Sequence, residues 1–249
     1  MPAYGTIVPV RLSPLAAGNP IFVGSHPSTI ALTPNGGTAY VTNPSTRVID
    51  VVNLASGVVE PPIAGVTDPQ GIAMAPDGQR AYVSAGDNVV SSVVPIDLTT
   101  GRALAPIAVD SPSAGYLAGP IAVSPDGRTA YTTNLESGCG SAQVSILSTA
   151  SNKLIAQLGG FSAPAGIALV GRTHTLYVLN VVPSRDGGIS SGRGRSAIDV
   201  NALVPSILST AASGCRCQYR LLLVRSESRN PDQSTRARLT PSAGDRDTV

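Results

Sequence analysis

The chain has 249 residues and a formal net charge of +2, and only 13% of its residues are charged. This length suits one large domain or two small ones, and the low charge excludes a chain kept unfolded by charge repulsion. The cationic excess lies after residue 183, so residues 1–183 have no electrostatic footprint for nucleic acid. Three cysteines make neither a disulfide framework nor a zinc site, and no apolar run is long enough to span a membrane.

The N-terminal stretch "MPAYGTIVPVRL" lacks a basic start followed by an apolar core, so no secretory signal is predicted. It ends at Leu12 and is followed, nine residues later, by the Ile of a Pro-Ile pair. The same half-unit returns as "RVIDVVNL" and "SSVVPIDL", which end at Leu54 and Leu98 and have the same distance to a Pro-Ile pair. Turn-like residues lie between the two apolar runs each time, which predicts a recurring β-hairpin.

A different hairpin recurs four times. Its copies are "TIALTPNGGTAYVTN" from Thr29, "GIAMAPDGQRAYVSA" from Gly71, "PIAVSPDGRTAYTTN" from Pro120 and "GIALVGRTHTLYVLN" from Gly166. In the first three copies Pro-Asn-Gly or Pro-Asp-Gly forms the turn, where Gly is expected in the left-handed position. Each copy has a Tyr ten residues after an Ile, and we expect the rings to pack between neighbouring units; they belong to Tyr40, Tyr82, Tyr131 and Tyr177.

The two hairpins together give four short strands in about 42 residues, the distance from Tyr40 to Tyr82, which is typical of a β-propeller blade. A β-solenoid usually has a shorter period, and an ordinary sandwich does not repeat its turn chemistry. We therefore predict an all-β fold, a β-propeller of about four four-stranded blades, closed or incomplete. Three whole blades are expected at 24–64, 66–108 and 114–158.

The two ends of the repeat region are half-units. Residues 5–22 supply a second hairpin without a first, and residues 164–180 supply a first hairpin without a clear second. We expect these to pair as a composite blade that closes a domain of residues 1–183 and removes free sheet edges. The alternative is that Ser196–Pro205 continues the last sheet. Residues 184–249 are interpreted as a linker and a mostly disordered basic tail.

The links between hairpins and between blades are expected on one face, and both unexplained insertions fall there. Insertions gathered on one face often mark the binding face of a repeat protein. The candidate ligand-binding residues on this face are His26, Asn43, Asp68, Asp87, Tyr116, Asn134, Glu136 and Asn180. The three asparagines have a structural alternative, which is to end strands by hydrogen bonds from the side chain to the backbone.

The sequence offers no catalytic set, since no Gly-rich phosphate loop, Ser-His-Asp set or Cys-His pair is present. The two histidines, His26 and His174, are expected on opposite faces. Asp68, Asp87 and Glu136 could ring a channel mouth and hold a divalent cation through oxygen atoms. Otherwise the sequence predicts no metal site and no cofactor, and it favours a protein that is not an enzyme.

The strings "AYVTN", "AYVSA", "AYTTN" and "LYVLN", each after a turn of this kind, resemble the YVTN family of β-propeller repeat proteins over roughly residues 5–180. The resemblance implies a bacterial or archaeal origin, a propeller of usually about seven blades, and often an extracellular or cell-envelope setting. Related propellers include binding scaffolds and some lactone hydrolases.

The expected function is therefore a non-catalytic binding or scaffold module, with an unknown protein or small-molecule ligand on the inter-hairpin loop face. Two alternatives stand beside it. One is a lactonase-like hydrolase with a metal at the channel mouth. The other is a truncated propeller remnant without independent function, which would explain the abrupt loss of the repeat.

Overall fold

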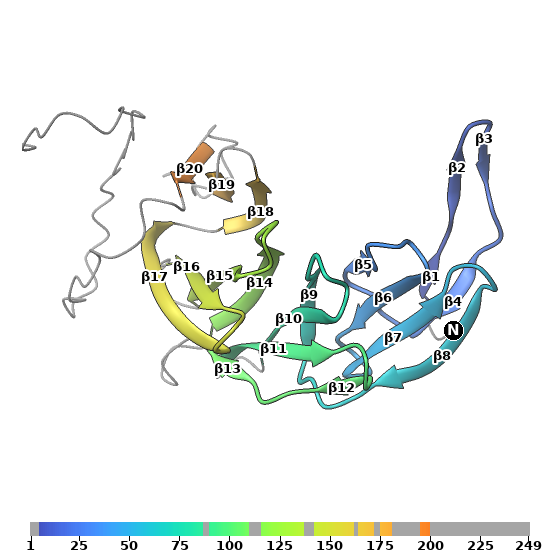
Figure 1. The fold of residues 1–249 in the computed structure, drawn as a ribbon, viewed down its shortest axis with the longest axis horizontal. Helices are drawn as coiled ribbons and strands as arrows, with labels where there is room; N and C mark the ends of the chain where they lie inside the picture. Colours follow the sequence, from blue (N-terminus) through green and yellow to red (C-terminus); the bar gives the residue numbers. More distant parts are fainter. Residues whose placement is uncertain are drawn as a thin grey trace, which may run out of the picture.

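The computed structural model describes the chain from residue 5 to residue 199, with gaps. The described residues are 5–86, 90–109, 116–136, 142–161, 164–171, 175–180 and 195–199. Every regular element among them is a β-strand, and the strands form antiparallel sheets that follow one another along an open arc (Figure 1). The prediction of an all-β fold with four-stranded blades is confirmed.

The first four-stranded sheet, blade 1, contains β5 (Ile30–Leu32), β6 (Thr38–Asn43), β7 (Val48–Asn53) and β8 (Val58–Ile63), in that spatial order. The two central strands are buried on both faces, because another layer of strands packs against each face of the sheet. In Figure 1, β5 lies on the concave side of the arc and β8 lies on its convex rim.

Blade 2 contains β9 (Pro69–Met74), β10 (Arg80–Gly86) and β11 (Ser91–Asp97), with β9 innermost. Two short strands, β12 (Arg102–Ala103) and β13 (Ile107–Ala108), share the outer position, and both pair with β11. A proline precedes β13, and because proline has no backbone N–H it cannot continue the ladder between these two strands.

Blade 3 contains β14 (Tyr116–Val123), β15 (Thr129–Glu136), β16 (Ala142–Ser148) and β17 (Lys153–Phe161). Its inner strand, β14, is longer than the inner strands of the two preceding blades and contains a register shift against β15. The arrangement from the concave side to the convex rim is the same as in blade 1 (Figure 1).

The fourth sheet has three strands, β18 (Pro164–Val170), β19 (Thr175–Asn180) and β20 (Arg195–Asp199). β19 is central, and its Tyr177 pairs with Ala197 of β20. This sheet ends the arc, and β18 packs against β14 and β15 of the preceding blade.

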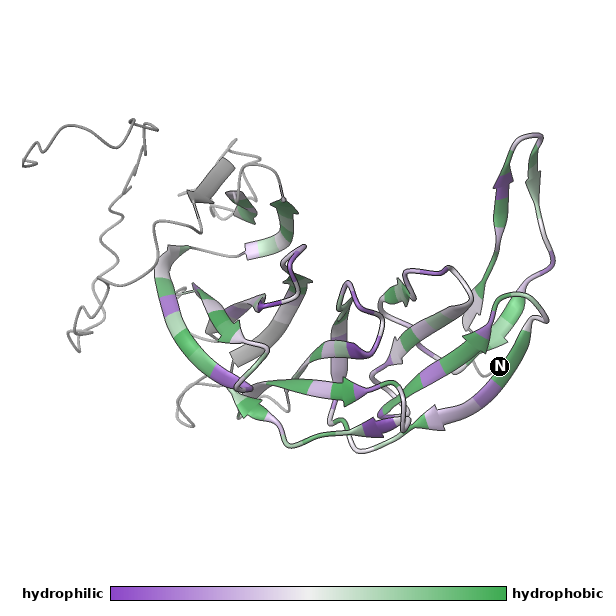
Figure 2. Ribbon diagram, in the orientation of Figure 1, coloured by the Kyte–Doolittle hydropathy of each residue, from purple (hydrophilic) through white to green (hydrophobic). Residues whose placement is uncertain are grey.

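An N-terminal hairpin lies at the other end of the arc. Its base pairs β1 (Gly5–Ile7) with β4 (Ile21–Val23), and its projecting part pairs β2 (Val10–Leu12) with β3 (Leu15–Ala17). All side chains of β2 and β3 are exposed, although most are apolar (Figure 2). Only the base packs on blade 1.

The expected composite blade of residues 5–22 with residues 164–180 is not formed, since the two segments lie at opposite ends of the arc (Figure 1). β19 instead pairs with β20, so the alternative in which Ser196–Pro205 continues the last sheet is closer to the observed pairing. The segment 184–249 thus contributes one strand, and its other residues lie outside the described part. The physical reason is loop closure, because β20 follows β19 closely in sequence whereas β1 would close a loop over most of the repeat region.

The repeated turns have the predicted chemistry. Gly36, Gly78 and Gly127 have φ angles of 69°, 68° and 70°, in the left-handed region that favours glycine. The acidic or amide side chain of the turn holds the backbone N–H two residues later. In the third copy, Asp126 Oδ1 accepts hydrogen bonds from Arg128 N at 3.0 Å and from Ser124 Oγ at 2.6 Å. The Ser124 hydroxyl and the Arg128 amide lower the pKa of Asp126, so its carboxylate is engaged by the turn.

The core consists of layers between successive sheets. Tyr40 of blade 1 lies in one apolar cluster with Ile72 of blade 2. The next layer brings Tyr82 together with Ile121 of blade 3. In the third layer, Tyr131 of blade 3 lies in one buried cluster with Leu176 and Val178 of the fourth sheet. Ile167 of the same sheet is partly buried and packs against this cluster.

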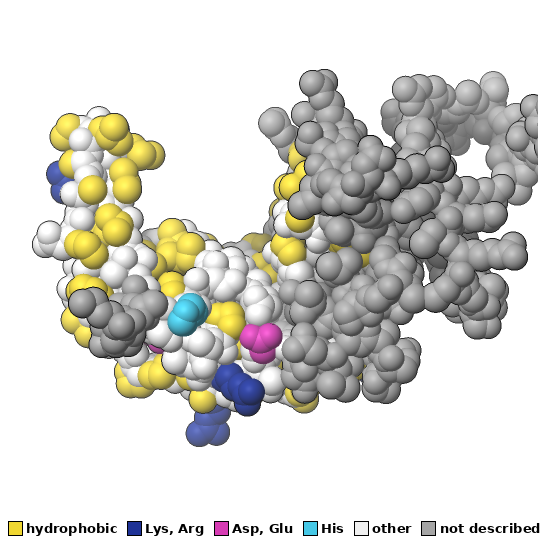
Figure 3. All heavy atoms as spheres, turned by 180° about the vertical axis from the view of Figure 1, so that it is seen from behind, with side chains coloured by type: hydrophobic (Ala, Val, Ile, Leu, Met, Phe, Trp, Pro, Cys, Tyr) yellow, Lys and Arg dark blue, Asp and Glu magenta, His cyan; other side chains and the backbone are white. Residues whose placement is uncertain are grey.

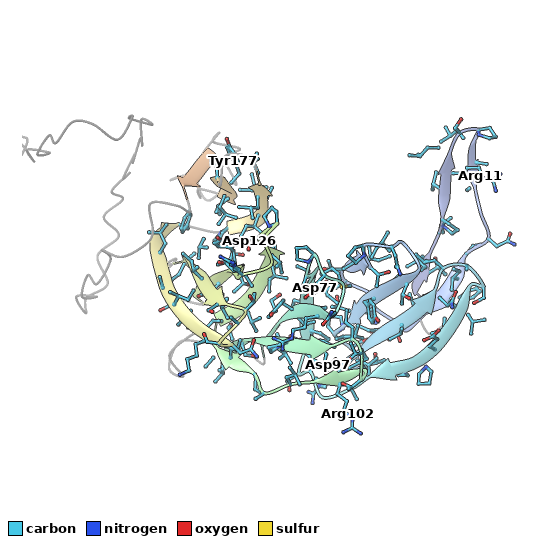
Figure 4. The ribbon with its side chains drawn as sticks, in the orientation of Figure 1. Arg11, Asp77, Asp97, Arg102, Asp126 and Tyr177 are labelled. Carbon is cyan, nitrogen blue, oxygen red and sulfur yellow. The ribbon has the colours of Figure 1, made fainter. Side chains whose placement is uncertain are left out.

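The expectation for the repeated tyrosines is therefore confirmed for three of them. Tyr40, Tyr82 and Tyr131 are 8%, 1% and 4% exposed, whereas Tyr177 is 44% exposed. Burial raises the pKa of Tyr40 and Tyr131, because a buried phenolate would lose its hydration. The physical reason for the difference is position, because none of the described sheets follows β18–β20 along the arc to cover Tyr177 (Figure 4).

The same truncation should therefore have different effects at two equivalent positions. Tyr82→Ala should lower the free energy of unfolding by about 3 kcal/mol, as expected for deletion of a buried aromatic ring. Tyr177→Ala should lower it by less than about 1 kcal/mol, because that side chain is only partly covered. Chemical denaturation of the two variants and the parent measures both changes, and equal effects would contradict the layer description.

Candidate functional site

Side-chain hydroxyls join the concave ends of neighbouring blades. Thr42, two residues after Tyr40, donates to the Gln70 carbonyl oxygen of blade 2 at 2.9 Å and accepts from the Thr29 backbone N–H at 3.0 Å. Ser84, two residues after Tyr82, donates to the Gly119 carbonyl oxygen of blade 3 at 2.6 Å. We call these two contacts the hydroxyl clamps. Both hydroxyl-bearing residues are fully buried, so the clamps fix how the inner strands stand relative to one another.

The second clamp depends on the glycine opposite it. Ser84 Oγ also accepts a hydrogen bond from the Gly71 N–H at 2.9 Å. A Cβ atom at Gly71 would lie 2.8 Å from Ser84 Oγ and 3.1 Å from the Gly119 carbonyl oxygen, closer than real Cβ atoms come to the hydroxyl. Glycine is therefore required here for the close approach of two inner strands.

The third equivalent hydroxyl has no partner. Thr133, two residues after Tyr131, is fully buried, and its Oγ1 makes no hydrogen bond in the described part of the chain. The fourth equivalent is Leu179, which has no hydroxyl. Among the three described joints, the clamps thus operate at the first two and not at the third.

The asparagines of the repeated strings serve the fold internally. Asn43 Nδ2 donates to Asp50 Oδ2 at 3.1 Å, in a buried pair that a Cβ atom at Gly24 would overlap. Asn134 Nδ2 donates to Ser145 Oγ at 2.9 Å. It also donates to the backbone carbonyl oxygen of residue 109, at 3.2 Å. Both asparagine side chains have 0% exposure, so neither presents its amide to solvent.

A hollow of about 300 Å³ lies across three inner strands, near the starts of β5 and β9 and the middle of β14. Its lining combines hydroxyl, amide, backbone and aliphatic groups, and consists of Ser28, Thr29, Gln70, Gly71, Ile72, Gly119, Pro120 and Ile121. The Gln70 side chain is positioned by Asp68, whose Oδ1 accepts from Gln70 Nε2 at 3.0 Å. Thr29 Oγ1 donates to the Gln70 carbonyl oxygen at 2.8 Å, which holds the first two inner strands together at this point.

The structure describes the side chains of some predicted binding residues and only the backbone of others. Of those with described side chains, His26 is exposed and precedes the lining residue Ser28 by two positions, and Asp68 is half-buried beside Gln70. The structure pairs Tyr116 with Glu136 across β14 and β15, so Tyr116 begins a strand instead of lying within a loop. Asn180 ends β19.

Asp87 lies outside the described residues, as does the turn that contains His174. The first residues of the predicted insertion, 110–115, do so as well. The structure therefore brings Asp68 to the hollow and does not place the predicted acidic ring.

The shifted pKa values belong to turns and core, and none lies at the hollow. Besides Tyr40, Tyr131 and Asp126, one more described residue has a shifted pKa. It is Asp97, whose pKa is lowered by the hydrogen bond from the Thr99 hydroxyl. Figure 4 shows Asp77 and Asp126 on turns of their blades and Asp97 at the end of β11. No group of three or more His, Cys, Asp or Glu side chains in the described ranges could hold a metal ion, and those ranges contain no helix able to cross a membrane.

The lining residues that the sequence analysis missed share one position in the repeat. Ser28, Gln70 and Gly119 each stand two residues before the repeated Ile of the first hairpin. This spacing is a signal that could have found them, because it places all three at the same end of the inner strands. Their types differ, which is why a search for chemically reactive residues passes over them.

No family model and no curated protein matches the sequence. Solved structures do match. Hydrazine synthase of Kuenenia stuttgartiensis has a TM-score of 0.65 at 19% identity, over 75% of this chain and 53% of that one. A protein from Lactobacillus plantarum has a TM-score of 0.58 at 18% identity, over 75% and 63%. The β-propeller domain of Swd1 from Myceliophteria thermophila has a TM-score of 0.57 at 12% identity, over 71% and 56%.

Likenesses at 12–19% identity show the fold alone, and with the observed sheets they establish a β-propeller fold for this chain. The chain spans between 53% and 63% of the length of these structures.

The hydroxyl clamps give a matched pair of substitutions. Thr42→Val should lower the free energy of unfolding by about 1–3 kcal/mol, because it removes the bond to Gln70 and leaves the Thr29 N–H unsatisfied. Thr133→Val should be neutral or stabilising, because it replaces a buried hydroxyl without a partner by a methyl group. Urea unfolding of both variants tests the contrast, and a larger loss for Thr133→Val would contradict it.

Proposed function

We propose that the chain is a non-catalytic β-propeller module that binds a ligand or partner at the hollow across the inner strands of blades 1 to 3. The observation that carries this proposal is the hollow itself, which three successive blades build at equivalent positions of the repeat. The hydroxyl clamps beside it support the proposal, since they hold two of the inner strands in fixed positions before any ligand arrives.

The lining suggests an uncharged ligand. Hydroxyl, amide and backbone groups supply hydrogen bonds, the two isoleucines supply an apolar surface, and no lining residue carries a charge. A volume of about 300 Å³ is at the lower end of the range for small-molecule sites. It fits a small neutral molecule, or one or two side chains of a bound peptide. Among the described residues of the face drawn in Figure 3, apolar side chains outnumber charged ones.

The choice of a binding role over hydrolysis rests on the acid nearest to the lining. Asp68 is already the acceptor for Gln70 Nε2, so its carboxylate orients an amide of the hollow. A lactonase-like mechanism would need a metal held by several oxygen ligands at the channel mouth. Asp68 is the one member of the predicted acidic set whose side chain is described.

Filling the hollow should abolish binding. Ser28 is exposed, and its backbone N–H bonds to Thr42, so Ser28→Trp adds bulk without removing that hydrogen bond. Ligand-observed NMR with a library of neutral, hydrogen-bonding fragments should give hits that bind the parent and not this variant. The matched control is Ser151→Trp, an equally exposed serine on the turn between β16 and β17, which should keep the hits.

Hits that persist in Ser28→Trp, or a library without any hits, would count against the proposed surface. A chain that is only a remnant without independent function would give the second result.

Metal content separates the binding role from the hydrolase alternative. A hydrolase of this kind should retain about one divalent metal per chain. We expect purified protein, dialysed against metal-free buffer and analysed by plasma mass spectrometry, to hold far less than one. Stoichiometric metal together with turnover of a lactone substrate would favour the hydrolase.

A further inference from the structure

Each joint between blades uses the same pair of residue types. The Tyr of one blade shares an apolar cluster with the repeated Ile of the next, and we call this contact the Tyr–Ile joint. The joints are formed by Tyr40 with Ile72, Tyr82 with Ile121, and Tyr131 with Ile167. The series defines which surface fits against a repeated Tyr: the inner strand of a following blade.

One half of a further joint is exposed at the C-terminal end of the arc. Tyr177 is 44% exposed and Leu179, on the same face of β19, is 59% exposed. The alternate residues of the strand, Leu176 and Val178, are buried against blade 3. Figure 4 shows Tyr177 at this end of the arc, in the last of the described sheets.

The other half is exposed at the N-terminal end. Ile30 and Leu32 of β5 are 49% and 50% exposed, whereas Ile72 and Ile121 at the position equivalent to Ile30 are 6% and 9% exposed. The reason is that the N-terminal hairpin covers only part of blade 1. Its Ile7, Ile21 and Val23 pack on the central strands β6 and β7, and the inner strand β5 remains uncovered.

We propose that the two exposed halves meet between two copies of this chain, so that Tyr177 of one copy packs against Ile30 of the other. Two copies related by a twofold axis would form two such joints. Each new joint continues the series already present inside one copy, with the same residue types in the same positions of the repeat. The exposed surfaces on both sides are apolar, so their burial supplies the driving force.

A second copy fits better than the same chain as the occupant. The two halves lie at opposite ends of an open arc, and β1–β4 do not pair with β18–β20 (Figure 1). The chain also spans only 53–63% of the length of the matched structures. Two copies would provide about eight blade positions. Each copy brings three complete blades. Two further positions are shared, and in each of them β18–β20 of one copy stands beside the β1–β4 base of the other. That number is within the range of about four to eight for closed propellers.

The new joint would differ from the first two internal joints, and resemble the third, in one respect. Leu179 stands where Thr42 and Ser84 form the hydroxyl clamps, so the intermolecular joint has no clamp hydrogen bond. Association would therefore depend on apolar contact. It should respond weakly to salt concentration, because screening acts on charges.

The test measures the dissociation constant of self-association for the full chain by sedimentation equilibrium. Tyr177→Glu and Ile30→Glu each put a charge into the joint, and each should weaken association by about tenfold or more. Leu12→Glu is the matched control, because Leu12 is 82% exposed on the projecting hairpin and takes no part in the joint. This control should associate like the parent.

A mixture of the two joint variants distinguishes a lost contact from misfolding. In a mixture of Tyr177→Glu and Ile30→Glu chains, the unchanged Ile30 of the first can meet the unchanged Tyr177 of the second, so one intact joint forms. Heterodimers should then appear at concentrations where each variant alone is monomeric, a result that misfolded chains cannot give.

Several results would overturn the proposal. A monomeric parent would show that Tyr177 and Ile30 do not pair between two copies. Failure of the mixture to associate, or loss of association in Leu12→Glu, would place the contact elsewhere. Growth beyond two copies would rule out the closed pair, since a head-to-tail contact that does not close gives an open chain.

Discussion

A blade of this protein is apolar on both faces, so it is stable only between two neighbours. The isoleucine that each blade presents to the preceding one and the tyrosine it presents to the following one are the two sides of this requirement. This constraint explains how the burial of the repeated residues changes along the arc. Burial is complete for Tyr82 in the middle and fails for Tyr177 at one end and Ile30 at the other. The N-terminal hairpin covers the central strands of blade 1 but leaves its inner strand exposed, because the hairpin is only half a blade.

Much of the fold could be predicted because the relevant signals are local. The glycines of the Pro-Asn-Gly and Pro-Asp-Gly turns have the expected positive φ, and the distance of ten residues from Ile to Tyr fixes the first hairpin of each blade. The pairing of the chain ends could not be predicted in this way. Which strand adds to an edge depends on loop closure and on what else lies nearby. The sequence indicated β20 only as an alternative, in which Ser196–Pro205 continues the last sheet.

The candidate site was less accessible to sequence reasoning than the fold. Asn43 and Asn134 carry groups that could bind a ligand, and the structure uses both inside the frame. Gln70, by contrast, has an unremarkable sequence setting and becomes part of the hollow only because Asp68 and Thr29 hold it there. The polar residues of the repeated string therefore join strands and blades, and the binding surface that we propose lies at the variable positions before each Ile.

The repetition of one joint also bears on how such a chain can change in length. Blade 2 presents Ile72 to blade 1 and Tyr82 to blade 3, so its two faces already complement each other. A tandem duplicate of residues 66–108 would find a matching neighbour on each side without any new contact having to arise. The arc is in this sense a modular scaffold, whose curvature and span an engineer could alter by copying or deleting whole blades.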